Sequence, residues 1–305
     1  MKVEKIRTDE LPPQASYKLT EATLLGSPGF ARVWREAGGL DVCWCVVDSG
    51  EITTVMTGVE FRRKPLIRFQ SMPDGLYCRP VTLRGGSSAE ANQALLAALA
   101  KAGYARIYIN DFERRFEYAH GFKVIDGATS LVDIAADWQP PDTTMRSELR
   151  KAEREGVKVT PFDAGRHLAQ FVELAGRTEH RHGREPKYTA AFYRHLAVVA
   201  FHEPRIRWFV VEHGQRLAAS HIYFIEGSML LHWQACFDKE FSFLKPNQWL
   251  TYSIARQAAA GGVRTLNLGA SPPEAEGLAS YKSHWGGRPF NYPCLQRHSF
   301  TGRWL

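Results

Sequence analysis

The segment WFVVEHGQRLAASHIYFI, residues 208–225, matches an earlier segment of the chain, WCVVDSGEITTVMTGVEF, residues 44–61. Both segments begin with Trp-x-Val-Val and place an acidic residue two positions before a glycine. An apolar run, a short turn with glycine and a second apolar run are typical of a β-hairpin. The sequence therefore predicts two equivalent hairpins and an internal duplication of the chain.

The residues that follow each hairpin extend the repeat. ANQALLAALAKAGYARIYIN covers residues 91–110, and NQWLTYSIARQAAAGGVRTLNLG covers residues 247–269. In each copy an alanine-rich segment that is typical of a helix ends at glycine, which is favoured after the last turn of a helix. A short strand follows at once. The second copy also predicts two helices before its hairpin and a third antiparallel strand, SMLLHWQACFD at 228–238, after it.

Strands in the middle and helices outside predict an α/β fold with a mixed sheet that is partly antiparallel. The repeated order of elements predicts two tandem domains. The segment AADWQPPDTT, residues 135–144, contains a Pro-Pro step of the kind that separates domains. We expect an N-terminal domain at residues 1–138 and a C-terminal domain at residues 139–305.

Composition limits the class of protein. The chain has 305 residues, of which 44% are hydrophobic and 23% are charged, as in a folded globular protein. Its first residues lack the apolar stretch of a signal peptide, and no apolar run is long enough to span a membrane. We therefore expect a cytoplasmic protein. The five cysteines are odd in number and scattered, which argues against a disulfide framework, and Cys43-x-Cys45 lacks the second pair of a zinc site.

The net charge of +7 permits a polyanionic partner such as RNA or a coenzyme A pyrophosphate, although it also fits an ordinary soluble surface. The densest basic segment is MRSELRKAEREGVKV, residues 145–159, in which glutamates alternate with arginines and lysines. Mixed charges at helical spacing indicate an exposed helix with ion pairs on its surface.

The order of all these segments resembles the FemAB-type acyltransferases, a tandem-domain branch of the GNAT (GCN5-related N-acetyltransferase) superfamily. The resemblance is carried by LRKAEREGV at 149–157, by the second hairpin and by LASYKSHWGG at 278–287. It implies two GNAT-like domains, the first on the acceptor side and the second on the donor side. It also implies transfer of an acyl or aminoacyl group from an activated donor to an amine, without a metal, a tightly bound cofactor or a covalent intermediate.

Two candidate catalytic residues lie in the strand at 228–238. Strict alternation puts His232 and Gln234 on the same face, together with Leu230 and Cys236, so this face is expected to border a cleft. A histidine accepts a proton near neutral pH. The alternative interpretation is a half-buried histidine paired with a neighbouring strand.

The donor's phosphates require a binding site of their own. The resemblance implies a loop of backbone amides before the second helix, where Asn247 stands in place of the usual glycine and tolerates a left-handed backbone. Lys245 adds charge there. The segment TEHRHGREPKYTAAF contributes Arg181, Arg184 and Lys187, which we expect on the donor side of a cleft together with Lys245. An ordinary helix start and a solvated loop remain the alternatives.

The C-terminal segment NLGASPPEAEGLASYKSHWGG, residues 267–287, provides the remaining candidates. The loop at Ser271-Pro272-Pro273 is expected to bend the chain away from a strand end, and the following residues to bring Tyr281 and Lys282 back beside the reaction centre. By the resemblance, Lys282 neutralises a phosphate or a developing oxyanion. We expect it to be an exposed lysine that contributes little to stability, and Trp285 to pack into the core.

Three functions fit the sequence. The first is an aminoacyl-tRNA-dependent transferase, although the chain lacks a long heptad-rich insertion like that of the family's best-known members. The second is an N-acyltransferase that uses acyl-CoA or an acyl-carrier protein, with a small-molecule or peptide amine as acceptor. The third is a non-catalytic GNAT-fold module that binds a nucleotide-sugar or RNA.

Overall fold

The computed structural model describes residues 1–85, 89–117, 120–271 and 275–299. The chain divides into two compact units. Unit 1 comprises Met1–Gly127 and Asn291–Leu305, and unit 2 comprises Ala128–Phe290. Among the described residues, no helix is long and apolar enough to cross a bilayer.

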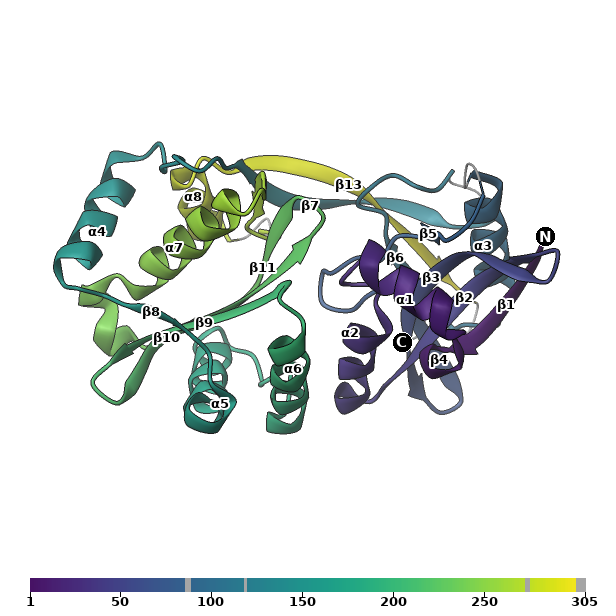
Figure 1. The fold of residues 1–305 in the computed structure, drawn as a ribbon, viewed down its shortest axis with the longest axis horizontal. Coiled ribbons are helices and arrows are strands. Elements are labelled where there is room, and N and C mark those ends of the chain that lie inside the picture. The colour runs from purple at the N-terminus through teal and green to yellow at the C-terminus, as the bar shows by residue number, and fades with distance from the viewer. Residues whose placement is uncertain (86–88, 118–119, 272–274, 300–305) are drawn as a thin grey trace. The chain divides into compact units, whose positions relative to one another are not determined.

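Unit 1 contains a mixed sheet with the strand order β1-β2-β3-β4-β6-β13 (Figure 1). All neighbouring strands are antiparallel except β4 and β6, which are parallel. The strands are β1 (Lys2–Arg7), β2 (Gly39–Asp48), β3 (Glu51–Arg63), β4 (Leu66–Gln70), β6 (Arg106–Asn110) and β13 (Arg288–His298), with the short β5 (Val81–Thr82) beside β3. The helices are α1 (Pro13–Ala22), α2 (Pro28–Val33) and α3 (Ala89–Lys101).

Unit 2 repeats this arrangement with the order β8-β9-β10-β11-β12-β7, in which only β11 and β12 are parallel. Its strands are β8 (Val159–Pro161), β9 (Ile206–His213), β10 (Arg216–Glu226), β11 (Met229–Phe237), β12 (Thr265–Asn267) and β7 (Lys123–Asp133). Its helices are α4 (Thr143–Arg154), α5 (Ala164–Arg181), α6 (Ala190–His202), α7 (Pro246–Ala260) and α8 (Glu276–His284).

The two predicted hairpins are confirmed as β2–β3 and β9–β10, and the order of strands agrees between the units. The sixth strand of each unit, however, comes from the other half of the sequence. β7 follows β6 along the chain, yet its residues Leu131–Asp133 pair with β12. β13 follows α8, yet its residues Cys294–His298 pair with β6. The division of the chain therefore differs from the expected bounds at residue 138 and at the C-terminus.

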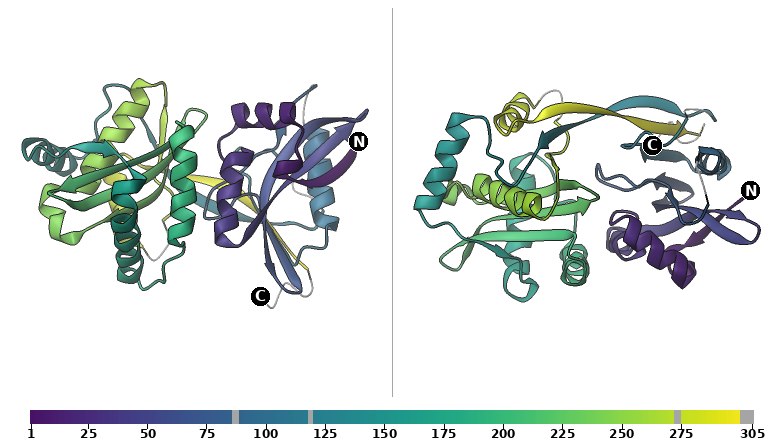
Figure 2. Two further views of the ribbon diagram at one scale, coloured as in Figure 1. Left: turned by 60° about the horizontal axis from the view of Figure 1, so that its bottom comes forward. Right: turned by 45° about the horizontal axis from the view of Figure 1, so that its top comes forward.

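Helices cover both faces of the sheet in unit 2. Figures 1 and 2 show α4, α7 and α8 on one face and α5 and α6 on the other. The core under α7 contains Tyr223 and Leu230 from the strands and the fully buried Trp285, as predicted for that tryptophan. This face carries the candidate site described below.

Local sequence explains where these helices begin. The carboxylates of Asp142 and Asp163 accept hydrogen bonds from backbone amides in the first turns of α4 and α5, and the hydroxyl of Thr189 does the same for α6. Pro246 is the first residue of α7, where a missing amide hydrogen costs nothing. The five cysteines are buried free thiols, in agreement with the predicted absence of a disulfide framework.

Candidate functional site

The candidate site lies in unit 2, where the parallel strands β11 and β12 stop pairing. Their register runs from Met229 opposite Thr265 to Leu231 opposite Asn267 and goes no further. Gly269 then turns the chain with a φ of +76°, a left-handed conformation that glycine adopts without strain. Its carbonyl accepts a hydrogen bond from the amide of Ser130 at 3.1 Å. The ends of β11 and β12 thus leave polar backbone atoms beside His232.

Lys282 of α8 reaches these carbonyls. Its Nζ donates to the oxygen of Gly269 at 2.8 Å and to that of Ala270 at 2.6 Å. The residue is only 4% exposed, so the expectation of an exposed lysine is wrong. Burial lowers its pKa to about 8, which leaves the ammonium mostly charged at neutral pH.

The end of α8 fixes Lys282 in place. Trp285 is fully buried and stacks on Trp138, with ring centroids 5.9 Å apart. A Cβ on Gly287 would lie 2.4 Å from Oγ of Ser130 and 2.6 Å from the carbonyl oxygen of Lys282. Only glycine allows this close approach. The predicted loop at Ser271-Pro272-Pro273 lies partly outside the described residues, and the segment after it is a helix.

His232, the first residue of β11 after the paired stretch, faces the same side as Lys282. Its ring stacks on that of Tyr223, with centroids 4.5 Å apart, and lies 4.7 Å from that of His221. Its Nε2 is buried and has no hydrogen-bond partner among the described residues. Burial lowers the pKa of His232 well below its usual value, and the neighbouring His221 ring and the ammonium of Lys282 lower it further. His232 is therefore neutral at physiological pH.

A buried network of hydrogen bonds lies next to His232. Nε2 of His221 lies 2.9 Å from Oδ1 of Asn247, and Nδ1 lies 2.9 Å from the hydroxyl of Tyr223. That hydroxyl also contacts Oγ1 of Thr251 at 3.3 Å. With an amide oxygen opposite Nε2, the proton belongs on Nε2, so Tyr223 donates to Nδ1. Burial lowers the pKa of His221 to about 4 and keeps the ring neutral.

Sequence reasoning missed His221, Tyr223 and Thr251. A signal was present, because a histidine and a tyrosine two positions apart in an apolar strand point to the same face. Tyr281, a predicted catalytic residue, packs against Trp285, and burial raises the pKa of its phenol. It thus lies against the core under α7.

Gln234 does not share a face with His232, so the prediction from strict alternation is wrong. A β-bulge at Trp233 sets Ile222 opposite Gln234 and Tyr223 opposite His232. The extra residue turns Gln234 towards α6, where its amide exchanges two hydrogen bonds with Tyr193, at 2.8 and 3.1 Å. Gln234 is therefore removed from the cluster around Lys282.

At the start of α7, the left-handed residue is Lys245, with a φ of +55°, and not Asn247 as expected. Asn247 instead holds His221. Nζ of Lys245 donates to Glu148 of α4 at 2.6 Å, and Gln248 donates to the other oxygen of that carboxylate. A phosphate at this helix start would have to compete with Glu148 for the lysine.

The other predicted donor residues lie around the connection from α5 to α6. Arg181 packs over the ring of Phe237 and donates to its carbonyl oxygen at 3.4 Å, while Arg184 pairs with Glu179. Lys187 is exposed beside Tyr188. Because α5 and α7 cover opposite faces of the sheet, the structure does not bring these residues together with Lys245 (Figure 2).

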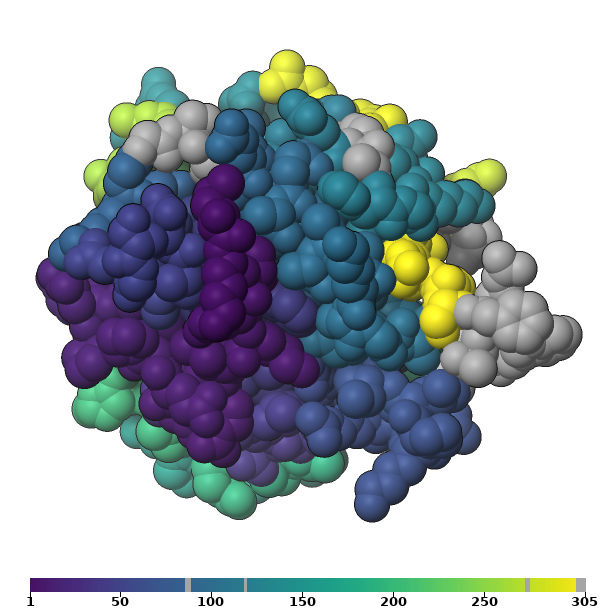
Figure 3. Space-filling model, turned by 90° about the vertical axis from the view of Figure 1, so that its right-hand side faces the viewer, coloured from purple at the N-terminus to yellow at the C-terminus, as the bar shows by residue number. Residues whose placement is uncertain are grey.

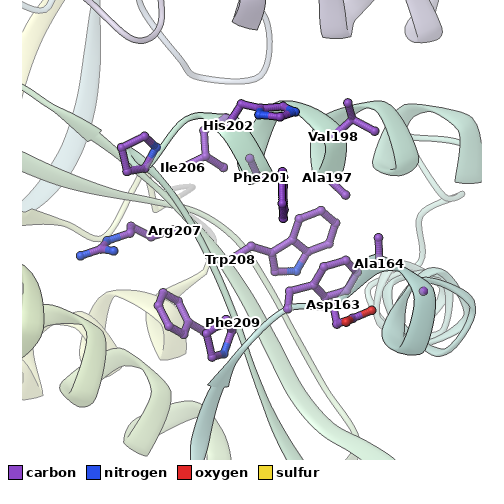
Figure 4. A pocket seen from close by; sticks show the side chains of 15 residues that line it. Asp163, Ala164, Ala197, Val198, Phe201, His202, Ile206, Arg207, Trp208 and Phe209 are labelled. Carbon is purple, nitrogen blue, oxygen red and sulfur yellow. The ribbon is translucent and has the colours of Figure 1, made fainter.

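A separate cavity of about 820 Å³ opens between the start of α5 and the end of α6 (Figure 4). Its lining is mainly apolar, with Trp208 stacked on Phe162 and with Phe201 from α6. The carboxylate of Asp163 in its wall caps α5. The predicted catalytic and donor residues are absent from its lining, so the cavity is distinct from the candidate site. Within the described part of the chain, no three histidine, cysteine, aspartate or glutamate side chains gather as metal ligands.

Comparison with known families finds a match over residues 142–283 to a family described as Acetyltransferase (GNAT) domain. This range contains Lys282, His232 and the network beneath them. Residues 142–283 of the chain are thus similar to a GNAT acetyltransferase domain. Comparison with curated proteins gives no match.

Solved structures show the same fold over nearly the whole chain. The structure of FemX, at 16% identity, covers 98% of both chains with a TM-score of 0.72. The C-terminal domain of a putative lysylphosphatidylglycerol synthetase from Agrobacterium fabrum, at 13% identity, covers 94% of this chain and 93% of its own, with a TM-score of 0.61. A tandem GNAT protein from the clavulanic acid biosynthesis pathway, at 12% identity, covers 97% and 98%, with a TM-score of 0.55. The predicted tandem GNAT-like fold and its likeness to FemAB-type proteins are confirmed.

Proposed function

We propose that this protein is an N-acyltransferase whose reaction takes place in the GNAT domain, beside Lys282 and His232. The observation that carries the proposal is the ammonium of Lys282, held by two carbonyls where β11 and β12 separate. A lysine ammonium has three N–H donors, and two of them are used. The third has no partner among the described residues and is available to a ligand.

The chemistry assigns a role to each group. The amine nitrogen of the acceptor attacks the carbonyl carbon of the donor, a C–N bond forms, and the C–O or C–S bond to the leaving group breaks. The negative charge that develops on the carbonyl oxygen is stabilised by Lys282. The attacking amine loses a proton, which neutral His232 accepts at Nε2 and returns to the leaving oxygen or sulfur.

The donor is an aminoacyl-tRNA or an acyl-CoA, and we favour the aminoacyl-tRNA. Lys245 is engaged by Glu148 at the start of α7, where the phosphates of coenzyme A were expected. The name of the putative lysylphosphatidylglycerol synthetase, whose fold is similar, also indicates an aminoacyl group. The tandem GNAT protein of similar fold was solved without AcCoA, and its association with that ligand keeps the acyl-CoA donor as the second candidate. The acceptor is a small-molecule or peptide amine.

Thermal-shift measurements with charged tRNA, uncharged tRNA and acetyl-CoA identify the donor, because a ligand that binds the folded state raises Tm. We expect charged tRNA to give the largest shift. A shift with acetyl-CoA alone would instead assign the acyl-CoA donor.

Turnover with that donor then tests the site. Lys282→Met retains the aliphatic stem and loses the charge, and it should reduce kcat by about ten- to a thousandfold. The matched control is Lys239→Met, which removes an exposed lysine elsewhere in the same unit. Wild-type turnover of Lys282→Met would contradict the proposed role of the lysine, whereas a wild-type protein without turnover on any of these donors would favour a non-catalytic module.

A further inference from the structure

The hairpin formed by β3 and β4 in unit 1 carries an unusual concentration of positive charge. Residues 61–73, FRRKPLIRFQSMP, contain three arginines and one lysine and no acidic residue. Figure 3 shows the end of this hairpin projecting from the surface of the unit. Arg62, Arg63, Lys64 and Arg68 are all exposed.

The sheet register places two further basic residues beside this hairpin. Arg68 is paired with Arg106 of β6, and Arg106 is paired with His298 of β13. Directly paired residues point to the same face, so these three side chains form a row across three strands. The next residue along each strand, Phe69 in β4 and Ile107 in β6, points to the opposite face and packs in the core with α3.

Several arginines elsewhere in the described part of the molecule are neutralised by carboxylates. Arg35 pairs with Asp41, Arg205 with Glu203, and Arg177 and Arg216 with Asp238. In contrast, neither Arg63 nor Arg68 has a carboxylate partner within the part of the chain that the structure describes.

The guanidinium of Arg68 lies over the ring of Phe61, 4.9 Å from its centre. Together with Leu66 and three other arginines, these two residues line a hollow of about 310 Å³. Arg68 is thus held flat against an aromatic ring at the wall of a basic hollow, a geometry that suits phosphate binding and stacking.

We propose that this surface, formed by Phe61, Arg63, Arg68, Arg106 and His298, binds the phosphate backbone of single-stranded RNA. The arginines Arg63, Arg68 and Arg106 extend over the strands β3, β4 and β6 rather than converging on one point, as a chain of phosphates requires and a single phosphate does not. The hollow offers a flat guanidinium on which a base stacks, which is a common mode of recognition for unpaired RNA. The charge lies along a sheet face and inside a hollow, whereas binding to an anionic membrane relies on basic charge around exposed apolar side chains.

The test is fluorescence anisotropy with a labelled, unstructured oligouridylate, titrated at several salt concentrations. Arg63→Gln/Arg68→Gln removes two phosphate contacts and should reduce the slope of log K against log salt by about 1.4. At about 0.1 M salt this corresponds to binding roughly 25-fold weaker than that of the wild type. Arg68→Lys keeps the charge but loses the stack, so it should retain the salt slope and bind only a few-fold more weakly.

The matched control is Arg150→Gln/Arg154→Gln, which removes the same charge from exposed positions of α4 in unit 2. It should bind RNA like the wild type within about twofold, apart from the change in net charge. Thermal melting of each variant verifies the fold. Equal losses in both double variants would show a non-specific effect of charge and overturn the proposal.

Two further probes separate other anions from RNA. Binding of phosphatidylglycerol vesicles but not of the oligouridylate would assign the surface to a membrane and overturn the proposal. Competition by inorganic pyrophosphate as strong as by unlabelled oligouridylate would assign a single-phosphate site and also overturn it. The proposal does not depend on acyl transfer. Lys282→Met should therefore bind the RNA as the wild type does, whatever the turnover of this variant.

Discussion

The two units contain the same parallel pair of strands, but the ends of these pairs differ. In unit 1 the chain beyond β4 and β6 is closed by hydrogen bonds. The amide of Ser71 donates to the carbonyl of Tyr108 at 2.9 Å, and the amide of Asn110 donates to the hydroxyl of Ser71 at 3.2 Å. The side chain of Asn110 donates to Leu76 and accepts from the thiol of Cys294.

In unit 2 the corresponding place retains polar groups with capacity to bind. Nε2 of His232 is buried without a partner among the described residues, and the ammonium of Lys282 is held nearby. Buried polar atoms are normally satisfied, so such an exception indicates a function. Under the proposed function, the duplicated fold uses one strand pair for structure and the other for chemistry.

The largest expected effect contrasts His232 with Ser71. His232→Gln removes the proton acceptor and should reduce kcat by about 10²- to 10⁴-fold. Ser71→Ala should leave kcat within about twofold and reduce the free energy of unfolding by about 1 kcal/mol, because one buried hydrogen bond is lost. Initial rates and urea unfolding of both variants measure the contrast. Full activity of His232→Gln would show that the attacking amine loses its proton elsewhere.

The next effect concerns the pH dependence of Lys282, because burial lowers the pKa of this lysine to about 8. Above that pH the ammonium loses its charge, so kcat should fall about tenfold per pH unit if the charge is essential. Stability should change in the opposite direction. Between about pH 8 and the ordinary lysine pKa near 10.4, the unfolded chain binds a proton that the folded chain has released, so the free energy of unfolding rises with pH.

The matched variants for this test are Lys282→Arg, which stays charged, and Lys282→Met, which has no titrating group. The rate of Lys282→Arg should be lower but should not show the decline above pH 8. Subtracting the unfolding free energies of Lys282→Met cancels all other titrations. A wild-type stability that follows Lys282→Met across this pH range would mean that the lysine is not buried in solution.

The third effect tests how closely the end of α8 is packed in unit 2. Gly287→Ala places a Cβ against Ser130 and the carbonyl of Lys282, and it should cost about 1–3 kcal/mol of stability together with some activity. Gly277→Ala, in the first turn of α8, meets nothing within 4 Å and should stabilise the protein by about 0.5–1 kcal/mol. Chemical denaturation compares the two. Equal stabilities would show that the loop yields easily and does not fix Lys282.

The fold was largely predictable because hairpins and helices depend on local patterns. The repeated Trp-x-Val-Val and glycine turns indicated the duplicated sheet, and the alanine-rich segments indicated α3 and α7. The crossing of β7 and β13 between the units was not predictable, because strand pairing between distant segments leaves no local signal. The helical form of α8 was missed, since Pro and Gly residues obscure the start of that segment.

The candidate site was predictable only in part. Lys282 and His232 lie in one cluster. Both were predicted as site residues because their segments lie near the ends of strands. The predicted position of Gln234 was wrong because a bulge of one residue reverses the alternation of side chains along a strand. Lys245 was expected to be available to a ligand, whereas Glu148, 97 residues earlier in the sequence, engages it. Such pairings depend on tertiary contacts that single-sequence patterns do not encode.

The smallest expected effect compares two asparagines, the half-buried Asn247 and the buried Asn92, each near the start of the helix before a parallel strand. Asn247 of α7 accepts from His221, while Asn92 of α3 donates to the carbonyl of Arg115 at 3.0 Å. Replacing either with alanine removes one hydrogen bond and should reduce the free energy of unfolding by about 1–2 kcal/mol. The effects on the reaction should differ. Asn247→Ala releases His221, which with Tyr223 supports the ring of His232, so kcat should fall by a few-fold while the KM for the donor is unchanged. Asn92→Ala should leave kcat unchanged. Steady-state kinetics beside urea unfolding measures both, and an equal loss of kcat in the two variants would mean that unit 1 also contributes to the reaction.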